Sequence, residues 1–478
     1  MRALPAELWK WDAVDLAPAI RRRRISSREA VRACLERLSA ANPAVNAVVQ
    51  VLAESALVEA SAADAAVKSG ETLGSLHGVP VTVKDNVDQE GLARTDGVVA
   101  FRDNIAREDS PAVANWRRAG AIVIGRTNTP AFSARWDTDN DVFGRTFNPW
   151  SRRRTAGGSS GGAAAALACG IGPLAHGNDL GGSIRYPAYC CGVAGIRPTM
   201  GRVPSYNPSV AEESAPVAQL IAVNGLLARR VADLRLGLAP LAAGDPRDPG
   251  WVPAPLTGPP PPRPIRVALV LSATGLHVHP AVEAAVLEAG AVLQDAGYAV
   301  EEADPPSIEA AAALWAKLGA ADTRHLGWPA LEKLADEGVK RINAFFMQSA
   351  PALDLPGYQR ALAEIRAHRR AWSLFLERYP IVLGPNSGDL AFEIGFDARD
   401  LEAFRHVMRS QALMVAVNLL GLPAVAVPTG MTAAADAPLG LPLGVQVIAG
   451  RFREDLALDA AEVVEARLGL ATPIDPVA

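Results

Sequence analysis

Two serines, each in its own glycine-rich segment, are the residues of this chain best suited to chemistry. Ser159 lies in G-G-S-S-G-G (157–162), and Ser183 lies further along in N-D-L-G-G-S-I-R-Y-P (178–187). One lysine, Lys84, follows the apolar part of G-V-P-V-T-V-K-D-N (78–86). A serine hydroxyl is a weak nucleophile until a nearby base takes its proton. The three residues together indicate a serine hydrolase whose base is lysine rather than histidine.

Lys84 can act as a base only if its amine is neutral near the working pH. The ordinary pKa of lysine is about 10.4, so burial or a positive neighbour must lower it. The alternating valines of 79–83 predict a buried strand that ends at Lys84, which is a place where the amine would lose solvent. The alternative is a lysine that pairs with Asp85 or Asp88 at the end of a strand.

Gly181 and Gly182 directly precede Ser183. Glycines allow consecutive backbone N–H groups to point into one small space, and such a concavity stabilises a tetrahedral oxyanion. The predicted donors are the N–H groups of Leu180, Gly181, Gly182 and Ser183. Taken singly, this segment is also compatible with a plain turn, and Ser159 with the N-cap of the alanine-rich helix that follows it.

These segments in combination resemble the amidase signature family. The match includes the two serine segments, the V-K-D-N segment, C-G-V-A-G-I-R-P-T (191–199), F-G-R-T-F-N-P-W (143–150) and L-P-L-G-V-Q-V-I-A-G (441–450). It covers nearly the whole chain and is weakest over residues 250–379. The resemblance implies one α/β domain of residues 1–478, with a mixed sheet covered by helices on both faces.

The resemblance also implies a role for each matched residue. Ser183 would be the nucleophile, and Lys84 would be the base that acts through Ser159, a serine held by a cis peptide bond in this family. The expected reaction is hydrolysis of a carboxylic amide through an acyl-enzyme, without metal or cofactor; aryl amides, esters and carbamates (urethanes) offer the same carbonyl chemistry. The supporting residues would be Ser160 in the lysine network, with Asp179 and Arg185 bracing the nucleophile loop.

Two segments depart from the family pattern. Asn178, Asp179 and Leu180 stand where Ser-Asp-Thr is common, a change that leaves backbone donation intact. Tyr186 stands where glutamine-dependent amidotransferase subunits typically carry glutamine. This favours a substrate other than glutamine, and a glutamine-hydrolysing amidotransferase subunit is kept as an alternative.

A second alternative is an α/β-hydrolase esterase, because G-G-S-S-G also satisfies G-x-S-x-G with Ser159 as nucleophile. His406 and Asp397 would complete that triad, and His77-Gly78 would loosely echo its oxyanion loop. Such a nucleophile needs a buried strand before it, whereas S-R-R-R-T-A (151–156) is polar and basic. Nucleotide binding is not indicated, because the chain lacks both common phosphate-binding glycine motifs.

Aromatic residues suggest an apolar or aryl substrate. The expected substrate-binding residues are Phe132, Trp136, Tyr186 and Phe346, and the approach to the site could also include Phe143 and Tyr206. Phe346 belongs to residues 308–379, whose pattern is almost entirely helical. We interpret these residues as a helical cap-like insertion, with ordinary outer helices as the alternative.

The elements that must position these residues alternate between short apolar runs and helical stretches, which is typical of an α/β fold. A Ser26-x-x-Glu29 capping box opens the first clear helix. The proline-rich stretch 253–264 is either a domain linker or an ordered surface crossing. The expected strands are 79–83, 121–125, 265–271, 381–384, 424–427 and 444–448, and the expected helices include 111–119, 280–296, 401–417 and 454–468.

The composition is that of an ordinary soluble globular protein. The chain has 478 residues, 49% of them hydrophobic and 21% charged, with a net charge of −4. This small charge gives no nucleic-acid footprint. The longest apolar stretch, 412–428, is too interrupted to span a bilayer. We expect a small-molecule substrate and no membrane or nucleic-acid partner. The sequence does not fix the oligomeric state, and a homodimer is one alternative.

The four cysteines show no disulfide framework or zinc spacing, so a reducing compartment and a cytoplasmic location are expected. His277 and His279 form an H-x-H pair without neighbouring ligands in the sequence. We therefore predict a surface loop there rather than a metal site.

Overall fold

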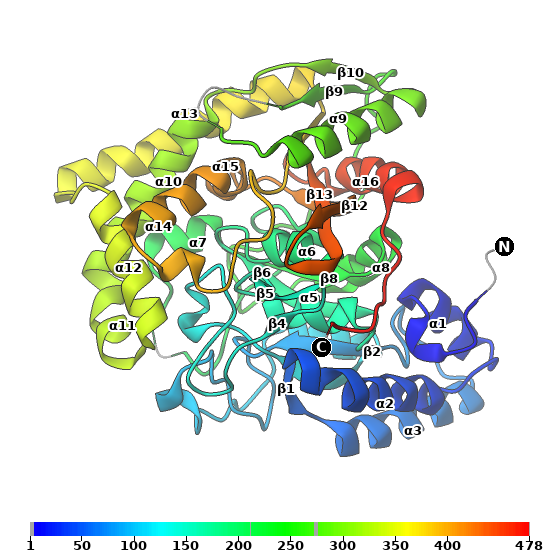
Figure 1. Ribbon diagram of the computed structural model, residues 1–478. Helices are drawn as coiled ribbons and strands as arrows, with labels where there is room; N and C mark the ends of the chain where they lie inside the picture. Colours follow the sequence, from blue (N-terminus) through cyan, green and yellow to red (C-terminus); the bar gives the residue numbers. More distant parts are fainter. Residues whose placement is uncertain (1–3, 211, 272–275, 478) are drawn as a thin grey trace.

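One large mixed sheet organises the protein in the computed structural model, which describes residues 4–210, 212–271 and 276–477 (Figure 1). Its strands are β1 (Val48–Val51), β2 (Pro80–Lys84), β3 (Ile122–Thr127), β6 (Leu174–Asp179), β7 (Ala194–Arg197), β8 (Val223–Ala228), β9 (Arg266–Leu269), β10 (Ala299–Glu302), β11 (Ile381–Pro385), β12 (Ala424–Ala434) and β13 (Ala437–Ala449). Their order is β1-β3-β2-β6-β8-β7-β12-β13-β11-β9-β10. Parallel pairs at β3-β2-β6 and β11-β9-β10 flank an antiparallel centre.

Helices cover both faces of this sheet, as the sequence predicted. They are α1 (Ala13–Arg21), α2 (Ser27–Val45), α3 (Ala53–Ser69), α4 (Pro111–Arg118), α5 (Gly161–Ala168), α6 (Arg185–Cys191), α7 (Pro216–Ile221), α8 (Val231–Leu241), α9 (Pro280–Asp295), α10 (Ile308–Asp322), α11 (Trp328–Leu334), α12 (Glu337–Ser349), α13 (Leu355–Arg378), α14 (Leu401–Ser410), α15 (Ala412–Leu420) and α16 (Glu454–Leu468).

Strand β11 shows why a buried strand of this fold is apolar throughout. Successive side chains of a strand point to opposite faces of the sheet. Ile381 and Leu383 pack in the core beneath α8, α9 and α16, whereas Val382 between them packs with α10, α13 and α15. Because both faces are covered, the strand reads as a continuous apolar run rather than an alternating one.

The capping box at the start of α2 forms as predicted. The Ser26 hydroxyl accepts a hydrogen bond from the Glu29 backbone N–H (3.1 Å), and the Glu29 carboxylate accepts one from the Ser26 N–H (2.7 Å). The proline-rich stretch 253–264 has neither helix nor strand. Since β8 before it and β9 after it belong to one sheet, it is a crossing within the fold.

Three predicted elements differ clearly in extent from the structure. The single helix expected over residues 401–417 is two helices, α14 and α15, because the chain breaks at Gln411. The strands expected at 424–427 and 444–448 are parts of a longer hairpin, β12 and β13.

The basic segment before Ser159 does form a strand, β5 (Ser151–Thr155), but it pairs with β4 (Phe147–Asn148) in a separate two-stranded sheet.

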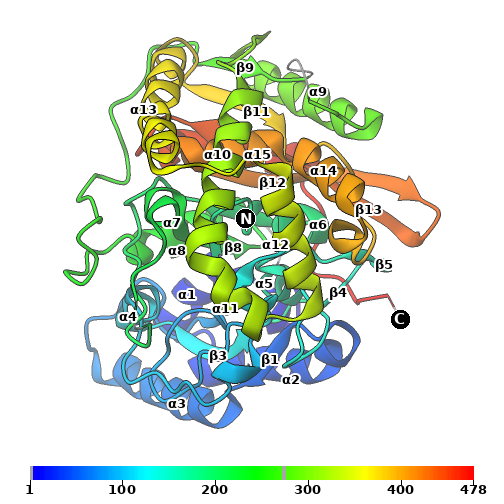
Figure 2. The same ribbon diagram turned by 90° about the vertical axis from the view of Figure 1, so that its left-hand side faces the viewer.

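Residues 308–379 are helical, and α10 to α13 lie together on one side of the molecule (Figure 2). Their description as a cap within a single domain of residues 1–478 stays a prediction. Across the described ranges, no helix is both long and apolar enough to cross a membrane. The cytoplasmic location and the homodimer also stay predictions.

Candidate active site

The three predicted catalytic residues come together at one edge of the sheet. Lys84 is the last residue of β2, and Asn178 lies near the end of β6, the parallel neighbour of β2. Parallel neighbours end at the same edge, which brings these two side chains together. Ser159 lies just before α5, and Ser183 lies in the loop that joins β6 to α6.

Lys84 is fully buried and has two polar neighbours. Its Nζ lies 2.6 Å from Ser159 Oγ and donates a hydrogen bond to Asn178 Oδ1 at 2.7 Å. Burial lowers the pKa of Lys84 to about 7, against the charges of Asp96 and Asp179, which act to raise it. A neutral amine keeps one N–H bond to Asn178 and directs its lone pair to the Ser159 hydroxyl. The geometry therefore suits proton acceptance from Ser159 at neutral pH.

Asp96 is the carboxyl whose charge acts most strongly on Lys84. Its Oδ1 accepts a hydrogen bond from Ser133 Oγ (2.8 Å), and Arg94 lies 3.8 Å away. Burial raises the pKa of Asp96 to about 6, although both neighbours oppose the shift. The charge state of Lys84 is thus linked to that of a carboxyl in the same site.

Ser183 faces a cavity that Ser159 also lines. The Ser183 carbonyl accepts a hydrogen bond from the Ser160 N–H (3.2 Å), and the peptide bond between Gly158 and Ser159 is cis. Within the described ranges, Ser183 Oγ forms no hydrogen bond with protein, so the hydroxyl is free to meet a ligand. The buried Ser160 hydroxyl also has no partner there. Its predicted place in the lysine network is therefore not seen, and only its backbone contacts the site.

Asp179 holds the loop that carries Ser183. Its Oδ1 accepts hydrogen bonds from the Gly182 N–H (2.9 Å) and from Arg185 Nη2 (3.0 Å), and its Oδ2 accepts one from Arg185 Nε (3.1 Å). Burial would raise the pKa of Asp179, but the guanidinium groups of Arg185 and Arg197 bring it well below its usual range. Both members of the Asp179–Arg185 pair are fully buried, so the loop is fixed by a desolvated ion pair.

The predicted oxyanion donors divide into two groups. The Gly182 N–H already donates to Asp179, so its prediction as a free donor is wrong. The N–H groups of Leu180, Gly181 and Ser183 donate to no protein acceptor among the described residues. These three remain available to a ligand oxygen beside the Ser183 hydroxyl.

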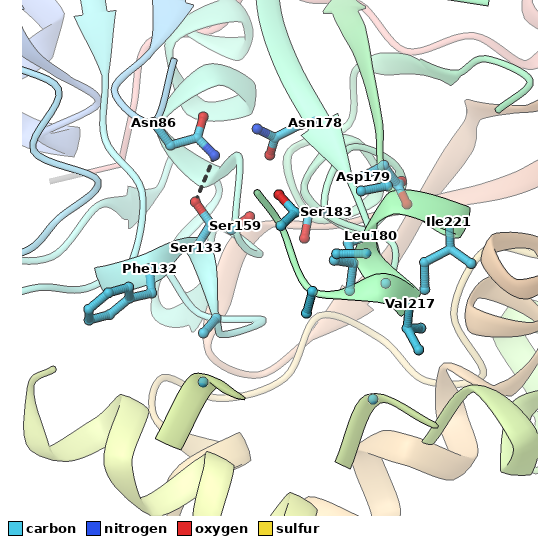
Figure 3. A pocket seen from close by; sticks show the side chains of 18 of the residues that line it. Asn86, Phe132, Ser133, Ser159, Asn178, Asp179, Leu180, Ser183, Val217 and Ile221 are labelled. Atoms are coloured by element: carbon cyan, nitrogen blue, oxygen red, sulfur yellow. Dashed lines mark hydrogen bonds between the residues drawn. The ribbon is translucent and has the colours of Figure 1, made fainter. Parts of the chain in front are cut away.

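The cavity in front of these loops has a volume of about 520 Å³ and two unlike sides. Figure 3 shows polar side chains, among them Ser159, Asn178 and Ser183, at one end, with Leu180, Val217 and Ile221 beyond them. The apolar side also includes Trp136, Trp315, Phe346 and Phe404. An apolar group attached to a carbonyl at Ser183 would find a matching surface there.

Three of the four predicted substrate-binding residues, Phe132, Trp136 and Phe346, line this cavity, and so does Tyr206. Tyr186 does not, and neither does Phe143. Helix α6 turns the Tyr186 ring into the core, where it stacks on Tyr189 at 6.4 Å and its hydroxyl accepts a hydrogen bond from the backbone of Phe392. The prediction that Tyr186 lines the substrate site is therefore wrong for this cavity.

The histidine triad of the α/β-hydrolase alternative does not form. Ser159 Oγ meets Lys84, and Asp397 is paired with Arg135 (2.8 Å). His406 instead lies 2.8 Å from Asp389, which also contacts His277 at 3.2 Å.

His277 lies in an exposed loop, as predicted, but it does have neighbours with ligand atoms. Asp389 and His406 give it the ligand neighbours that the sequence did not show, with all three ligand atoms within 4.8 Å of one another. None of these three residues lines the cavity described above. His279 instead caps α9, because its Nδ1 accepts a hydrogen bond from the Ala281 N–H (3.1 Å).

Sequence reasoning gave no role to Asn178, Asp96 or Trp315. Asn178 had a usable signal, since it precedes Asp179 in the nucleophile motif, at the end of a strand beside that of Lys84. Trp315 lines the cavity and donates from Nε1 to the Leu180 carbonyl (3.1 Å). A contact between two such distant segments leaves no local pattern in the sequence.

Comparisons with known proteins agree with this geometry. A family model described as Amidase matches residues 29–458. An indoleacetamide hydrolase of Bradyrhizobium diazoefficiens is 46% identical over 97% of this chain and 87% of its own length. An acylamidase of Rhodococcus erythropolis is 33% identical over 95% of this chain and 94% of its own. The structure of a bacterial aryl acylamidase of the amidase signature family superimposes with a TM-score of 0.81, at 26% identity over 96% of each chain.

A buried lysine lies beside a serine, next to a second serine in a glycine loop, and this is the arrangement expected of a lysine-dependent serine hydrolase. The chain belongs to the amidase family, whose members carry the amidase signature. It is an enzyme that hydrolyses amide bonds.

Proposed function

We propose that this amidase cleaves the amide of an arylacetic acid or a similar apolar acyl group through an acyl-enzyme on Ser183. The observation that carries the proposal is the 2.6 Å contact between Lys84 Nζ and Ser159 Oγ, beside a cavity whose far side is aromatic. The relative named indoleacetamide hydrolase supports an acyl group of this class.

The proton path of the proposed reaction runs from Ser183 through Ser159 to Lys84. Neutral Lys84 takes the Ser159 proton while Ser159 takes the proton of Ser183, and Ser183 Oγ attacks the amide carbon. The N–H groups of Gly181 and Ser183 have no protein acceptor among the described residues, and they would bind the oxyanion. The path requires Ser183 Oγ to turn toward Ser159 when substrate is bound, since catalytic hydrogen bonds are often completed only in that complex.

Collapse of the tetrahedral intermediate breaks the C–N bond. The proton held by Lys84 returns through Ser159 to the leaving nitrogen, which departs as ammonia or an amine. Water then attacks the acyl-enzyme by the same proton path, and this step releases the carboxylic acid and restores the Ser183 hydroxyl.

Glutamine hydrolysis for an amidotransferase is the second candidate and is less supported. Val217, Ile221, Phe346 and Phe404 offer no hydrogen bond to the polar end of a glutamine side chain. Polar residues such as Asn207, Asp322 and Asn343 also line the cavity, so the preference for an aryl group rests on these rings and on the relatives named indoleacetamide hydrolase and acylamidase.

A substrate panel tests the proposal. Indole-3-acetamide and phenylacetamide should have values of kcat/KM at least about 100-fold above that of acetamide, because a ring contact contributes discrimination of roughly 10–200-fold. An anilide, a carbamate, an ester and glutamine complete the panel and define the leaving group. Preference for glutamine or acetamide over both aryl substrates would contradict the proposal.

A further inference from the structure

The peptide groups between Asp179 and Ser183 differ in how many hydrogen bonds fix their orientation. A peptide unit is planar and trans, so the carbonyl of one residue and the N–H of the next point in opposite directions. A hydrogen bond to a carbonyl therefore also sets the direction of the following N–H. This relation links the proposed oxyanion donors to whatever binds the carbonyls behind them.

Two tryptophans bind consecutive carbonyls of this loop. Trp315 Nε1 donates to the Leu180 carbonyl (3.1 Å), and Trp136 Nε1 donates to the Gly181 carbonyl (2.8 Å). Trp315 comes from α10 and Trp136 from the segment between β3 and β4, so two distant parts of the chain hold one loop. Their rings are neighbours, with centroids 6.4 Å apart.

The two peptide groups differ in what else restrains them. The group between Gly181 and Gly182 is held on both sides, since Trp136 binds its oxygen and Asp179 binds its N–H. The group between Leu180 and Gly181 is held on one side only: Trp315 binds its oxygen, and the Gly181 N–H is free for a ligand. The direction of the Gly181 N–H thus depends on Trp315.

We propose that Trp315 is a positioning residue of the amidase, which orients the Gly181 N–H toward the oxyanion, while Trp136 braces the next peptide group. The inference rests on the proposed reaction at Ser183. The loop is packed closely enough for this role, because a Cβ on Gly181 would lie 2.9 Å from the Trp315 ring. Rotation of this peptide group is restricted by the ring as well as by the hydrogen bond.

Trp315 also lines the cavity, and its ring contacts Phe346 at a centroid distance of 5.5 Å. An acyl group that fills the apolar side therefore meets the same indole that holds the oxyanion loop. When contacts to a remote part of the substrate stabilise the transition state and not the bound substrate, they raise kcat and leave KM largely unchanged. Aryl substrates are thus expected to exceed acetamide mainly in kcat.

The test compares three Trp→Phe variants, each of which removes one indole N–H bond to a backbone carbonyl. Trp315→Phe should lower kcat on phenylacetamide about 10- to 100-fold, less than or comparable with complete loss of an oxyanion donor. Trp136→Phe should lower kcat less than Trp315→Phe does, because Asp179 still holds that peptide group. Trp372→Phe is the matched control: Trp372 is buried on α13 and donates to the Pro306 carbonyl (2.9 Å), away from the cavity. Its kcat should not change.

A second readout separates positioning from packing. A trifluoromethyl ketone analogue of the substrate forms an ionised adduct with the nucleophilic serine, so its inhibition constant should rise with the loss of kcat in Trp315→Phe, whereas KM should change little. Unchanged kcat and ketone inhibition, or a loss confined to KM, would overturn the inference. Benzothienylalanine at position 315 keeps the ring shape without the N–H, and it gives the same test if the phenylalanine variant does not fold.

Failure of the proposed reaction is recognised separately. If the ketone does not bind wild-type enzyme at Ser183, the proposed chemistry is wrong and the positioning role falls with it. If the ketone binds wild type and Trp315→Phe equally, only the positioning role is wrong.

Discussion

The two sides of the cavity are built in different ways. On the catalytic side, the side chains of Lys84, Asp179 and Arg185 are buried, and each has polar partners from other strands or loops. On the opposite side, helices α10, α12 and α14 present rings such as Phe346 and Phe404, which make nondirectional contacts. Buried polar groups tolerate little change, because the partner left unpaired carries the cost of desolvation. Apolar side chains that line a cavity can be substituted at a moderate cost in stability. Substrate selectivity can therefore change in this fold while the catalytic groups stay the same.

Arg185 shows how strongly the catalytic side is fixed. Besides Asp179, it donates to Asn418 Oδ1 (2.7 Å) and Gln446 Oε1 (3.0 Å), and it has no exposed surface. These partners come from α15 and β13, so the nucleophile loop is tied to the C-terminal half of the sheet. The aromatic side is tied to the loop by two hydrogen bonds, from the indole N–H groups of Trp136 and Trp315.

The largest expected effect comes from the base. Lys84→Ala should reduce kcat/KM by at least about 100-fold, in the range for loss of a general base. In the wild type, kcat/KM should rise with pH through about 7, because only the neutral amine accepts a proton and burial lowers the pKa of Lys84 to about 7. Steady-state rates from pH 5 to 9 measure both effects.

His406→Ala is the control for this prediction, because His406 contacts Asp389 and does not line the cavity. Its activity should stay within a few-fold of the wild type. If His406→Ala had no activity while Lys84→Ala remained active, histidine and not lysine would be the base.

A substitution on the aromatic side should change selectivity more than rate. Phe346→Ala should reduce the preference for phenylacetamide over acetamide by about 10-fold or more, which is the scale of one ring contact. Phe345→Ala is the matched control, since Phe345 lies beside it on α12 but does not line the cavity. Equal losses on both substrates in Phe346→Ala would remove this ring from the substrate site.

The smallest expected effect is a shift in the pH profile. The negative charge of Asp96 raises the pKa of Lys84, so Asp96→Asn should move the alkaline rise in kcat/KM to lower pH. Asp322→Asn removes a charge from the other end of the cavity and should leave the midpoint of the rise in place. A midpoint that stays fixed in Asp96→Asn would show that the two groups are not coupled during catalysis.

The same contrast explains how much could be predicted from sequence. Lys84, Ser159 and Ser183 stand in short segments whose glycines and strand context are local, so the sequence identifies their candidate roles. Tyr186 adjoins such a segment, yet its direction depends on how α6 packs against Phe392, a residue of a distant loop. Trp315 reaches the loop through tertiary packing of α10, which no local pattern records. The break at Gln411 was missed because the apolar pattern continues through it.

Covalent labelling tests the central claim most directly. Wild-type enzyme is treated with a fluorophosphonate, and the modified peptide is identified by mass spectrometry beside Ser183→Ala and Ser159→Ala. We expect the label on Ser183, its absence in Ser183→Ala together with loss of amide turnover, and slower labelling at the same residue in Ser159→Ala. A label on Ser159 in the wild type, or amide turnover that persists in Ser183→Ala, would contradict the account.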